Sequence, residues 1–568
     1  MHPAQYTFIT SLYPSFRGDI RSPNKIYNRR PILRGLMMDA PLSITTIMCH
    51  AQTTAANTKL ISRRADGSVC RLTYHQAFVR IAKLANALDC LNLNADARVG
   101  TLAWNDNRHF ELHYAVPCSG RICHTINPKL FSEQIKFIIN DAEDEALFID
   151  PQFIPVIEDM MDQLPSVKHW IALCSADSLP ISKLPNLKSY ESLLACEKSI
   201  YDWPFLDENR ASNLCYTSGT TGDPKGVLGS HRSIVLQCMS QNMASNLGLT
   251  SEDAVMPMVP MFHVNAWCMP YSAPMAGAAL VLPGPNVSDA SAMVDLINQE
   301  KVTFSLAVPT LWSGINQYLK SSGVSIPSLV RGVTGGAAGS LKLYEEMDSH
   351  GVTLENGWGM TELSPIGSYN RQLSWHHQLQ DDARIEQRLK SGRPLFGVQM
   401  RIVDEDGNSL PHDGHTTGVL EIRGPWTCSA YYGKAQEHDW FNTGDVATID
   451  PNGYMRITDR VKDVIKSGGE WISSIEIENV VMSHPGVREA VVIGIAHQHW
   501  SERPLLIVVP NDNNPVLTPG ELLSYLEGKV PKWWIPNACE FVETLPHTAT
   551  GKVSKKMLRE DFNHYQWS

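Results

Sequence analysis

The stretches Ala278-Ala-Leu-Val-Leu282 and Thr303-Phe-Ser-Leu-Ala-Val308 decide the fold class of this 568-residue chain. Both are short apolar runs, and a helix-like pattern lies between them. The same alternation occurs earlier, where Arg98-Val-Gly-Thr-Leu-Ala103 and Ala146-Leu-Phe-Ile149 flank a helical stretch at 111–116. Because strands that alternate with helices build parallel sheets covered by helices, the sequence predicts an α/β fold.

The pattern changes twice toward the C-terminus. Residues from about 395 to 457 contain short strands, such as 400–403 and 418–423, separated by the turn pairs Asp406-Gly407 and Asn452-Gly453. This is typical of a small β-rich module. After Arg460 we expect a short strand at 463–465, a helix at 474–482, a strand at 490–493 and a helix at 519–529. The sequence thus predicts a large N-terminal domain of helix-covered sheets with a β-rich module, followed by an α+β C-terminal domain.

Composition excludes several classes of function. Lys and Arg number 48 against 59 Asp and Glu, a net charge of −11, which disfavours nucleic acid or an anionic membrane as a partner. No apolar run approaches the ~18–20 residues of a membrane span. The 12 cysteines are scattered without a C-x-x-C pair, which indicates reduced thiols and a cytoplasmic protein. The histidine pairs His376-His377 and His497, His499 lack a third metal ligand at suitable spacing and are predicted to lie on the surface.

The first 35 residues are expected to form an N-terminal extension. Residues 1–34 carry six basic side chains against Asp19 alone. The extension is interpreted either as a targeting or docking arm or as a solvated segment before the folded core, and the second interpretation is favoured.

The most informative motif is Tyr216-Thr-Ser-Gly-Thr-Thr-Gly-Asp-Pro-Lys-Gly226, which follows the apolar Leu214-Cys215. Its glycines let the backbone approach a ligand closely, and its hydroxyls and Lys225 add donors and a positive charge. Such a strand-to-loop junction predicts a cradle for a polyphosphate anion. The spacing is not that of a Walker A loop.

This motif resembles the signature of the acyl-adenylate-forming superfamily, which includes acyl-CoA synthetases, peptide-synthetase adenylation domains and firefly luciferase. Further motifs of that family follow in order. They are Trp358-Gly-Met-Thr-Glu362, Phe441-Asn-Thr-Gly-Asp445, Asp459-Arg-Val-Lys-Asp463, Ile465-Lys-Ser-Gly-Gly-Glu-Trp471 and His547-Thr-Ala-Thr-Gly-Lys552. The resemblance covers residues 36 to 562. Two positions depart from the family's pattern: Ser501 stands where relatives usually carry glycine, and Glu355 precedes Asn356.

The resemblance implies a nucleotide site and catalytic residues. Asp445 and Arg460 would bind the ribose hydroxyls, Asn356 and the face of Trp358 would bind adenine, and Gly335-Gly336-Ala337 would line its opposite face. The implied ATP- or AMP-binding set is Thr217, Ser218, Gly219, Thr220, Thr221, Gly222, Lys225, Gly335, Gly336, Ala337, Asn356, Gly357, Trp358, Gly359, Met360, Thr361, Asp445, Ile457 and Arg460. The implied catalytic set is Lys552, Glu362, Thr217 and His263, with Glu362 as the ligand of Mg²⁺.

The same resemblance implies an acyl pocket and a moving lid. The pocket would be lined by His263, Val264, Trp267, Val308, Trp312 and Gly335. A large acid- and ATP-binding domain (36–459) would be followed by a small lid (460–568) that turns about Lys462. The turn would exchange Lys552 for a coenzyme A-side segment made of Lys466, Ser467, Gly468, Gly469, Glu470 and Trp471.

The predicted function is that of an ATP-dependent acyl-CoA synthetase. It would use ATP, Mg²⁺ and coenzyme A, form an acyl-adenylate from a medium-chain or similar aliphatic acid, and release AMP and pyrophosphate. The segments His124 to Pro128, Pro260 to Trp267 and Val530 to Pro536 resemble bacterial medium-chain fatty acyl-CoA synthetases and methylmercaptopropionate-CoA ligases. The alternatives are a short thioether acid or an aryl acid as substrate, or a catalytically inactive acyl- or nucleotide-binding relative. The sequence indicates small-molecule partners and is compatible with a homodimer.

Overall fold

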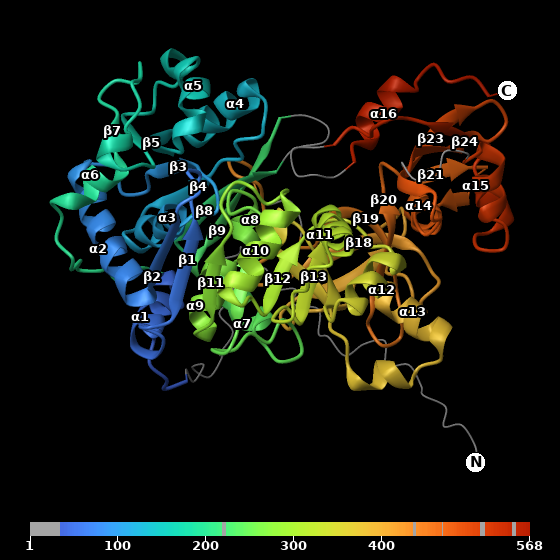
Figure 1. Ribbon diagram of the computed structural model, residues 1–568, viewed down its shortest axis with the longest axis horizontal. Coiled ribbons are helices and arrows are strands. Elements are labelled where there is room, and N and C mark those ends of the chain that lie inside the picture. Colours follow the sequence, from blue (N-terminus) through green and yellow to red (C-terminus); the bar gives the residue numbers. More distant parts are fainter. Residues whose placement is uncertain are drawn as a thin grey trace, which may run out of the picture. The chain divides into compact units, whose positions relative to one another are not determined.

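Two large sheets with helices between and outside them make up most of the chain (Figure 1). The computed structural model describes residues 35–217, 223–435, 439–468, 470–511, 517–547 and 553–567. Residues 41–568 belong to one compact unit, which the following account concerns.

The first sheet has seven strands in the order β7-β6-β5-β3-β4-β8-β9. All its neighbours run parallel except β8 and β9, which form an antiparallel hairpin. The strands are β3 (Arg98–Leu102), β4 (Ile122–Thr125), β5 (Asp144–Ile149), β6 (His169–Ala172), β7 (Lys188–Ser189), β8 (Ala211–Thr217) and β9 (Lys225–Ser230).

The second sheet has nine strands in the order β16-β15-β14-β13-β12-β10-β11-β1-β2, with a parallel centre and antiparallel edges. The strands are β1 (Lys59–Arg63), β2 (Val69–Thr73), β10 (Ala254–Pro257), β11 (Ala279–Leu282), β12 (Phe304–Ala307), β13 (Arg331–Gly335), β14 (Thr353–Gly359), β15 (Ile366–Asn370) and β16 (Arg393–Pro394).

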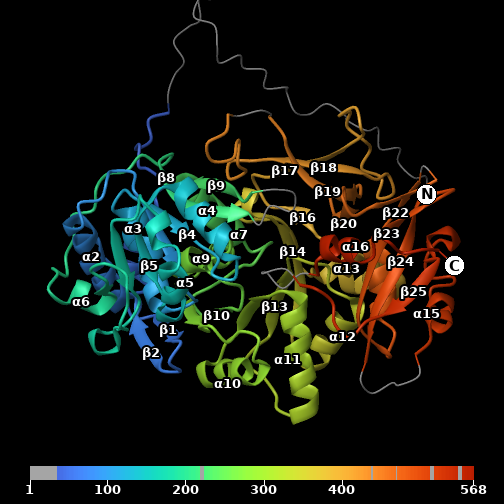
Figure 2. The same cartoon turned by 90° about the horizontal axis from the view of Figure 1, so that it is seen from above.

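Helices fill three layers around these sheets (Figure 2). The central layer, which shares one core with both sheets, contains α1 (Ile44–Thr54), α2 (Tyr74–Cys90), α3 (Asn107–Cys118), α6 (Tyr190–Ala195), α7 (His231–Gln241) and α9 (Met269–Ala276). The outer layers contain α4 (Ser132–Ala142) and α5 (Ile154–Glu158) on the first sheet, and α10 (Ala290–Glu300), α11 (Pro309–Ser322) and α12 (Leu341–Ser349) on the second.

Side-chain alternation along the strands explains this layering. On β5, Ala146 and Phe148 enter the central core, whereas Leu147 and Ile149 enter the outer core with α4 and α5. Successive side chains of a strand point to opposite faces, so a strand that is apolar throughout is buried on both. The continuous apolar run at 146–149 therefore required helices on both sides of the sheet.

Two smaller sheets follow. The predicted β-rich module is an antiparallel sheet of β17 (Gln399–Val403), β18 (Gly418–Arg423), β19 (Phe441–Ile449) and β20 (Met455–Arg460), preceded by α13 (Asp381–Leu389). The C-terminal sheet has the order β22-β21-β24-β23, with β25 paired to β24. Its elements are β21 (Ile465–Ser467), β22 (Glu470–Ile472), α14 (Ser474–Met482), β23 (Val487–His497), β24 (Ser501–Pro510), α15 (Pro519–Tyr525), β25 (Ala538–Phe541) and α16 (Lys555–Asp561).

Most predicted elements are confirmed, with two local differences. The strand expected at 463–465 begins at Ile465, because the amides of Asp463 and Val464 both donate to the carbonyl of Arg460 and close a turn there. The helix expected at 519–529 ends at Tyr525, and a turn that contains Gly528 at φ +73° follows. Within the described ranges, no helix is both long and apolar enough to cross a membrane.

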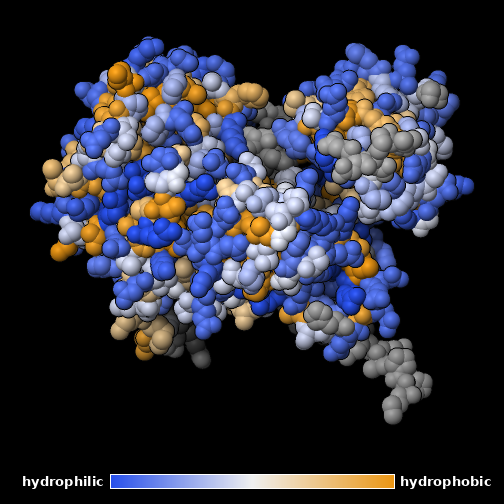
Figure 3. Space-filling view, viewed as in Figure 1, coloured by the Kyte–Doolittle hydropathy of each residue, from blue (hydrophilic) through white to orange (hydrophobic). Residues whose placement is uncertain are grey.

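The surface prediction for His376 is wrong. Its side chain is 1% exposed and packs edge-on against Trp375 and Tyr454. Its Nδ1 accepts the amide of Leu373, so this histidine closes a turn of the chain instead of lying in solvent. On the face shown in Figure 3, hydrophilic side chains predominate and hydrophobic ones gather in small groups.

Candidate functional site

The β8–β9 hairpin carries the first part of the candidate site. Thr217, the last residue of β8, pairs with Lys225, the first residue of β9. The residues between them that were predicted to bind phosphate, Ser218, Gly219, Thr220, Thr221 and Gly222, lie outside the described residues. The exposed Lys225 places its ammonium 4.9 Å from the centre of the Tyr431 ring. A cation in that position is attracted by the ring's negative face, which orients Lys225 beside the hairpin.

Glu362 lies next to this lysine and tyrosine. It belongs to a short 3-10 helix (Thr361–Leu363), and its side chain is 6% exposed. The Tyr431 hydroxyl donates to Oε1 of Glu362 at 2.7 Å. Burial raises the pKa of the Glu362 carboxyl, while the Tyr431 hydrogen bond and the charges of Arg460 and Lys225 oppose that rise. The site therefore holds a carboxylate that is largely desolvated and whose ionised form is favoured by Tyr431 and by the charges of two cations.

Asp445 forms the second carboxylate centre. It is 2% exposed, on β19, and opposite Arg460 of β20 in the sheet register. Nε of Arg460 lies 2.6 Å from Oδ1 of Asp445. Nε1 of Trp358, at the end of β14, donates to Oδ2 of the same carboxylate at 2.9 Å. The structure thus brings Trp358, Asp445 and Arg460 together, and Arg460 connects them electrostatically to Glu362.

The remaining predicted nucleotide-binding residues lie along the ends of β13 and β14. Gly335 ends β13, and Gly336 (φ +80°) and Ala337 are exposed beyond it. Asn356 is 8% exposed and its amide donates to the Lys390 carbonyl at 3.2 Å. The other predicted members of this region are partly or fully buried nearby: Gly357, Gly359, Met360, Thr361 and Ile457. Met360 and Ile457 pack with Trp358 against one small core, so that core supports the indole.

The predicted acyl segment has an unusual backbone. Val264, Asn265, Ala266, Trp267 and Cys268 all have positive φ, between 47° and 60°. Residues other than glycine seldom adopt this left-handed conformation, and five in succession form a left-handed turn after His263. The turn places the half-buried Trp267 ring against β13: a Cβ added at Gly335 would lie 2.9 Å from that ring and 2.6 Å from the Gly357 carbonyl oxygen.

The structure does not bring the two predicted pocket tryptophans together. Trp312 of α11 is fully buried, donates to the Val333 carbonyl at 3.1 Å and lies over Gly332. Gly332 and Gly335 are three residues apart on one strand, so they face opposite sides of the sheet. Trp267 therefore lies on one face and Trp312 on the other, within the core beneath α11. Val308, half-buried, precedes α11.

The predicted hinge and coenzyme A-side residues follow β20. Lys462 is exposed in the turn after Arg460, and the amide of Val461 donates to the Gly444 carbonyl. Lys466, Ser467 and Gly468 form β21 and the start of its hairpin with β22, which carries Trp471. Gly469 and Lys552 lie outside the described residues, as does the side chain of Glu470.

Comparison with known proteins gives the family. A model of the AMP-binding enzyme family matches residues 49–432, and one of the AMP-binding enzyme C-terminal domain matches residues 476–552. The chain belongs to the AMP-binding enzyme family. The resemblance predicted from the motifs is therefore confirmed.

Two relatives of this AMP-binding enzyme align along nearly their whole length. It is 45% identical over 533 residues to a 3-methylmercaptopropionyl-CoA ligase of Ruegeria lacuscaerulensis, covering 93% of this chain and 98% of that protein. It is also 45% identical over 533 residues to a medium-chain-fatty-acid–CoA ligase of Ectopseudomonas oleovorans, covering 93% and 97%. A solved anthranilate CoA ligase in complex with anthranoyl-AMP has a TM-score of 0.82 at 24% identity, over 92% of this chain and 98% of that one. That likeness confirms the predicted fold class.

Sequence reasoning missed several residues around the family motifs. Tyr431, which bridges Lys225 and Glu362, belongs to none of the quoted motifs. A charged group across the predicted hinge was also missed: Oδ2 of Asp459 accepts the amide and hydroxyl of Ser474, at 2.7 and 2.6 Å. Lys555 completes it, with its ammonium 2.7 Å from Glu478. No sequence signal marks these partners, because each pair meets only in the folded chain.

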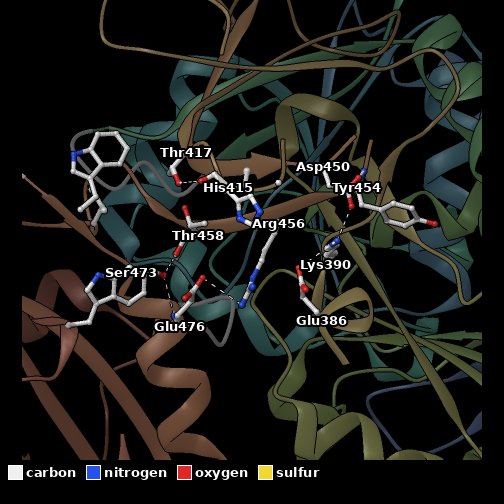
Figure 4. A pocket seen from close by; sticks show the side chains of 15 residues that line it. Glu386, Lys390, His415, Thr417, Asp450, Tyr454, Arg456, Thr458, Ser473 and Glu476 are labelled. Atoms are coloured by element: carbon white, nitrogen blue, oxygen red, sulfur yellow. Dashed lines mark hydrogen bonds and ion pairs between the residues drawn. The ribbon is translucent and has the colours of Figure 1, made fainter. Parts of the chain in front are cut away.

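A cavity of 320 Å³ lies between the β-rich module and the C-terminal sheet (Figure 4). Of the predicted site residues, only Trp471 lines it. Its charged side chains are paired, with Lys390 2.8 Å from Asp450 and Arg456 3.6 Å from Glu476. The cavity is therefore separate from the cluster around Glu362 and Asp445.

Proposed function

We propose that this AMP-binding enzyme is an AMP-forming acyl-CoA synthetase. The observation that carries the proposal is a pair of contact groups: Lys225 and Glu362 both contact Tyr431, and Trp358 and Arg460 both bind Asp445. The charge of Arg460 also lowers the pKa of Glu362. The cations and the buried carboxylate of Glu362 suit phosphate groups and their metal ion, and the second carboxylate, Asp445, suits the hydroxyls of a ribose. The CoA ligases at 45% identity support the same assignment.

The substrate is proposed to be a medium-chain or similar aliphatic acid. The two relatives at 45% identity are named for different substrates, a medium-chain fatty acid and 3-methylmercaptopropionate. Ligation of a short thioether acid is therefore the second candidate. The aryl acid and the inactive relative are weaker alternatives, and intact Glu362, Asp445 and Arg460 argue against loss of catalysis.

The residues present fit a Mg²⁺ ion that arrives with ATP. Mg²⁺ in nucleotide sites is held by one or two carboxylates together with phosphates and water. Glu362 supplies one buried carboxylate, on a 3-10 helix that contacts β8, the strand that ends at Thr217. The described residues contain no cluster of three or more His, Cys, Asp or Glu that would form a cage. When bound, Mg²⁺ would neutralise charge on the phosphates.

The first half-reaction joins the acid to AMP. A carboxylate oxygen of the acid attacks the α-phosphorus of ATP, an O–P bond forms, and pyrophosphate leaves with the electron pair of the broken bond. Lys225 and Lys552 would offset the negative charge of the two reactants. Asp445 and Arg460 would hold the ribose, and Asn356, Trp358 and the segment 335–337 would hold adenine.

The second half-reaction passes the acyl group to coenzyme A. The thiol sulfur attacks the carbonyl carbon of the acyl-adenylate, the thiol proton goes to solvent, and AMP leaves. We propose that the lid (460–568) turns about Lys462 relative to the large domain (36–459), so that Lys552 withdraws and the segment 466–471 approaches. His263, Val264, Trp267 and Val308 would border the acid.

Location and assembly complete the proposal. All 12 cysteines are free thiols, which supports a reducing compartment such as the cytoplasm. A homodimer is proposed as the assembly, and sedimentation of the purified protein tests it.

An acid panel tests the proposed function. Protein, Mg²⁺, ATP and coenzyme A are mixed with aliphatic acids of increasing length, thioether acids and aryl acids, while AMP and pyrophosphate are measured. We expect both products in equal amounts, with a maximum among aliphatic acids of medium length. Failure to exchange labelled pyrophosphate into ATP with every acid would exclude adenylation. Lys552→Ala should lose this exchange and still convert a supplied acyl-adenylate to thioester.

A further inference from the structure

The start of β24 lies directly beside the hairpin that joins β21 to β22. We call residues 466–468 the thiol-side loop, because the proposed function places them at the coenzyme A thiol. Ser467 is opposite Ser501 in the sheet register. The amide of Gly468 donates to the Trp500 carbonyl at 2.9 Å, and the amide of Lys466 donates to Oε2 of Glu502 at 3.0 Å. Two of the loop's backbone donors are therefore bound to one short segment.

Arg503, the next residue of that segment, binds the loop through a side chain. Its Nη1 donates to the hydroxyl of Ser467 at 3.2 Å, and Ser467 is 3% exposed. A buried hydroxyl that loses its donor is left partly unsatisfied, so this bond favours one position of the loop.

The same guanidinium binds a second segment, which connects the 3-10 helix Lys532–Trp534 to β25. Nη1 also donates to the Trp533 carbonyl at 2.8 Å, Nη2 to the Ile535 carbonyl at 3.1 Å, and Nε to Oδ1 of Asn537 at 2.6 Å. All three nitrogens of one planar group are thus engaged, and its fork fixes the two segments relative to each other.

Besides these bonds, the loop is held by its antiparallel pairing with β22, in which Lys466 lies opposite Trp471 and Ser467 opposite Glu470. Gly468 has φ +61°, and a Cβ added there would lie 2.9 Å from the Trp500 ring, so the ring covers the loop without binding it. A glycine-rich turn loses much conformational entropy when it is ordered, and directed bonds must compensate.

We infer that Arg503 is a positioning residue for thioester formation: it fixes the thiol-side loop through Ser467 and the segment 533–537. The inference rests on the proposed function. Adenylation depends on other groups, namely Glu362, Asp445 and Lys552. Arg503 therefore acts on the second half-reaction and leaves the first unchanged.

The experiment compares Arg503→Met with Arg503→Lys and with the control Arg488→Met. Arg488 lies on β23 of the same sheet and donates to the Glu543 carbonyl, away from the thiol-side loop. Pyrophosphate exchange into ATP reports the first half-reaction. Single-turnover transfer from preformed acyl-adenylate to coenzyme A reports the second.

For Arg503→Met we expect unchanged exchange and a transfer rate about 10²-fold lower, the size of effect that a displacement of about 1 Å produces in a catalytic site. Arg503→Lys should fall between this variant and the wild type, since an ammonium reaches fewer of the four acceptors. Arg488→Met should match the wild type in both assays. Equal losses in both half-reactions, or an unchanged transfer rate, would overturn the inference.

Ser467→Ala is a second variant that tests the same contact in case Arg503→Met does not fold. It removes only the acceptor on the loop and keeps Arg503 bound to the segment 533–537. We expect a smaller loss of the same kind, confined to transfer, and an unchanged transfer rate would count against the inference. A wild-type protein without pyrophosphate exchange would instead contradict the proposed function, so the two failures are distinct.

Discussion

The indole of Trp358 donates to Oδ2 of Asp445 at 2.9 Å, across the gap between β14 and β19. The other oxygen of that carboxylate lies 2.6 Å from Nε of Arg460. The aromatic residue proposed to stack on adenine thereby also orients the carboxylate proposed to bind ribose. A phenylalanine could stack equally well and could not make this bond.

Trp358→Phe tests the relationship. A hydrogen bond to a charged group contributes about 1.5–3 kcal/mol, so kcat/KM for ATP should fall about tenfold or more. The preference for ATP over 2′-deoxy-ATP, measured as the ratio of their kcat/KM values, should decrease toward one, because Asp445 is no longer held in place. Trp440→Phe is the control, since Trp440 lies between Arg401 and Arg423 in the β-rich module. An unchanged ratio in Trp358→Phe would show that the indole nitrogen does not affect ribose binding.

Tyr431→Phe should alter the pH dependence of adenylation. Glu362 is proposed to act as a carboxylate, so activity falls as pH falls through its raised pKa. The Tyr431 hydroxyl lowers that pKa, and its removal should raise the pKa further and move the acid limb to higher pH. The pH profile of pyrophosphate exchange measures this, with Tyr432→Phe as the neighbouring control. A shift to lower pH would contradict the assignment.

Trp267→Leu should change which acid is preferred. The ring lies against Gly335 at the proposed pocket, so its loss should favour longer or bulkier acids in the panel. Trp312→Phe is the matched control, because Trp312 lies in the core on the other face of the sheet. It should lower the thermal midpoint and leave the acid preference unchanged. If only Trp312→Phe changed the acid preference, the acyl pocket would lie on the face of the sheet opposite to the one proposed.

Lys555→Met should destabilise the protein. Its ammonium lies between Glu478 and Ser474, close to the 1% exposed Asp459. Loss of one partner of a buried ion pair costs about 3–5 kcal/mol. Lys556→Met is the control, because Lys556 and Glu560 are exposed and about 0.5 kcal/mol is typical of such pairs. Thermal unfolding measures both.

The loss of thermal stability in Lys555→Met should also depend on pH. Burial raises the pKa of Glu478 and of Asp459, and without the lysine two carboxylates face each other. Their repulsion is present when both are ionised, above the raised pKa values, and is relieved as they protonate at lower pH. The difference in midpoint between Lys555→Met and the wild type should therefore shrink on acidification. A difference that is constant with pH would rule out the charge interaction as its cause.

The sequence predicted the layered fold because strand and helix patterns are local. The buried run at 146–149 already implied helices on both faces of its sheet. It also predicted Glu362, Asp445 and Arg460 as members of ordered motifs, and in the structure Arg460 pairs with Asp445 and its charge lowers the pKa of Glu362. Ser501 stands where relatives usually carry glycine, and its φ of 67° explains why glycine is preferred at that position.

Other features depend on tertiary geometry and could not be predicted. Tyr431 and Glu362 are 69 positions apart, and only the fold places the hydroxyl on the carboxylate. The opposite placement of Trp267 and Trp312 follows from the register of Gly335 and Gly332 on β13. The burial of His376 depends on Tyr454, 78 positions away.

The left-handed turn at 264–268 has a further consequence. At about 1–2 kcal/mol for each residue, its five positions sum to about 5–10 kcal/mol, comparable with the net stability of a whole domain. Glycine, or a D-amino acid introduced by chemical ligation, would adopt this mirror-image geometry without that cost. Such replacements would also remove or redirect the side chains of Val264, Ala266 and Cys268, which are buried, so the backbone cost of this turn cannot be relieved without losing the packing that it makes possible.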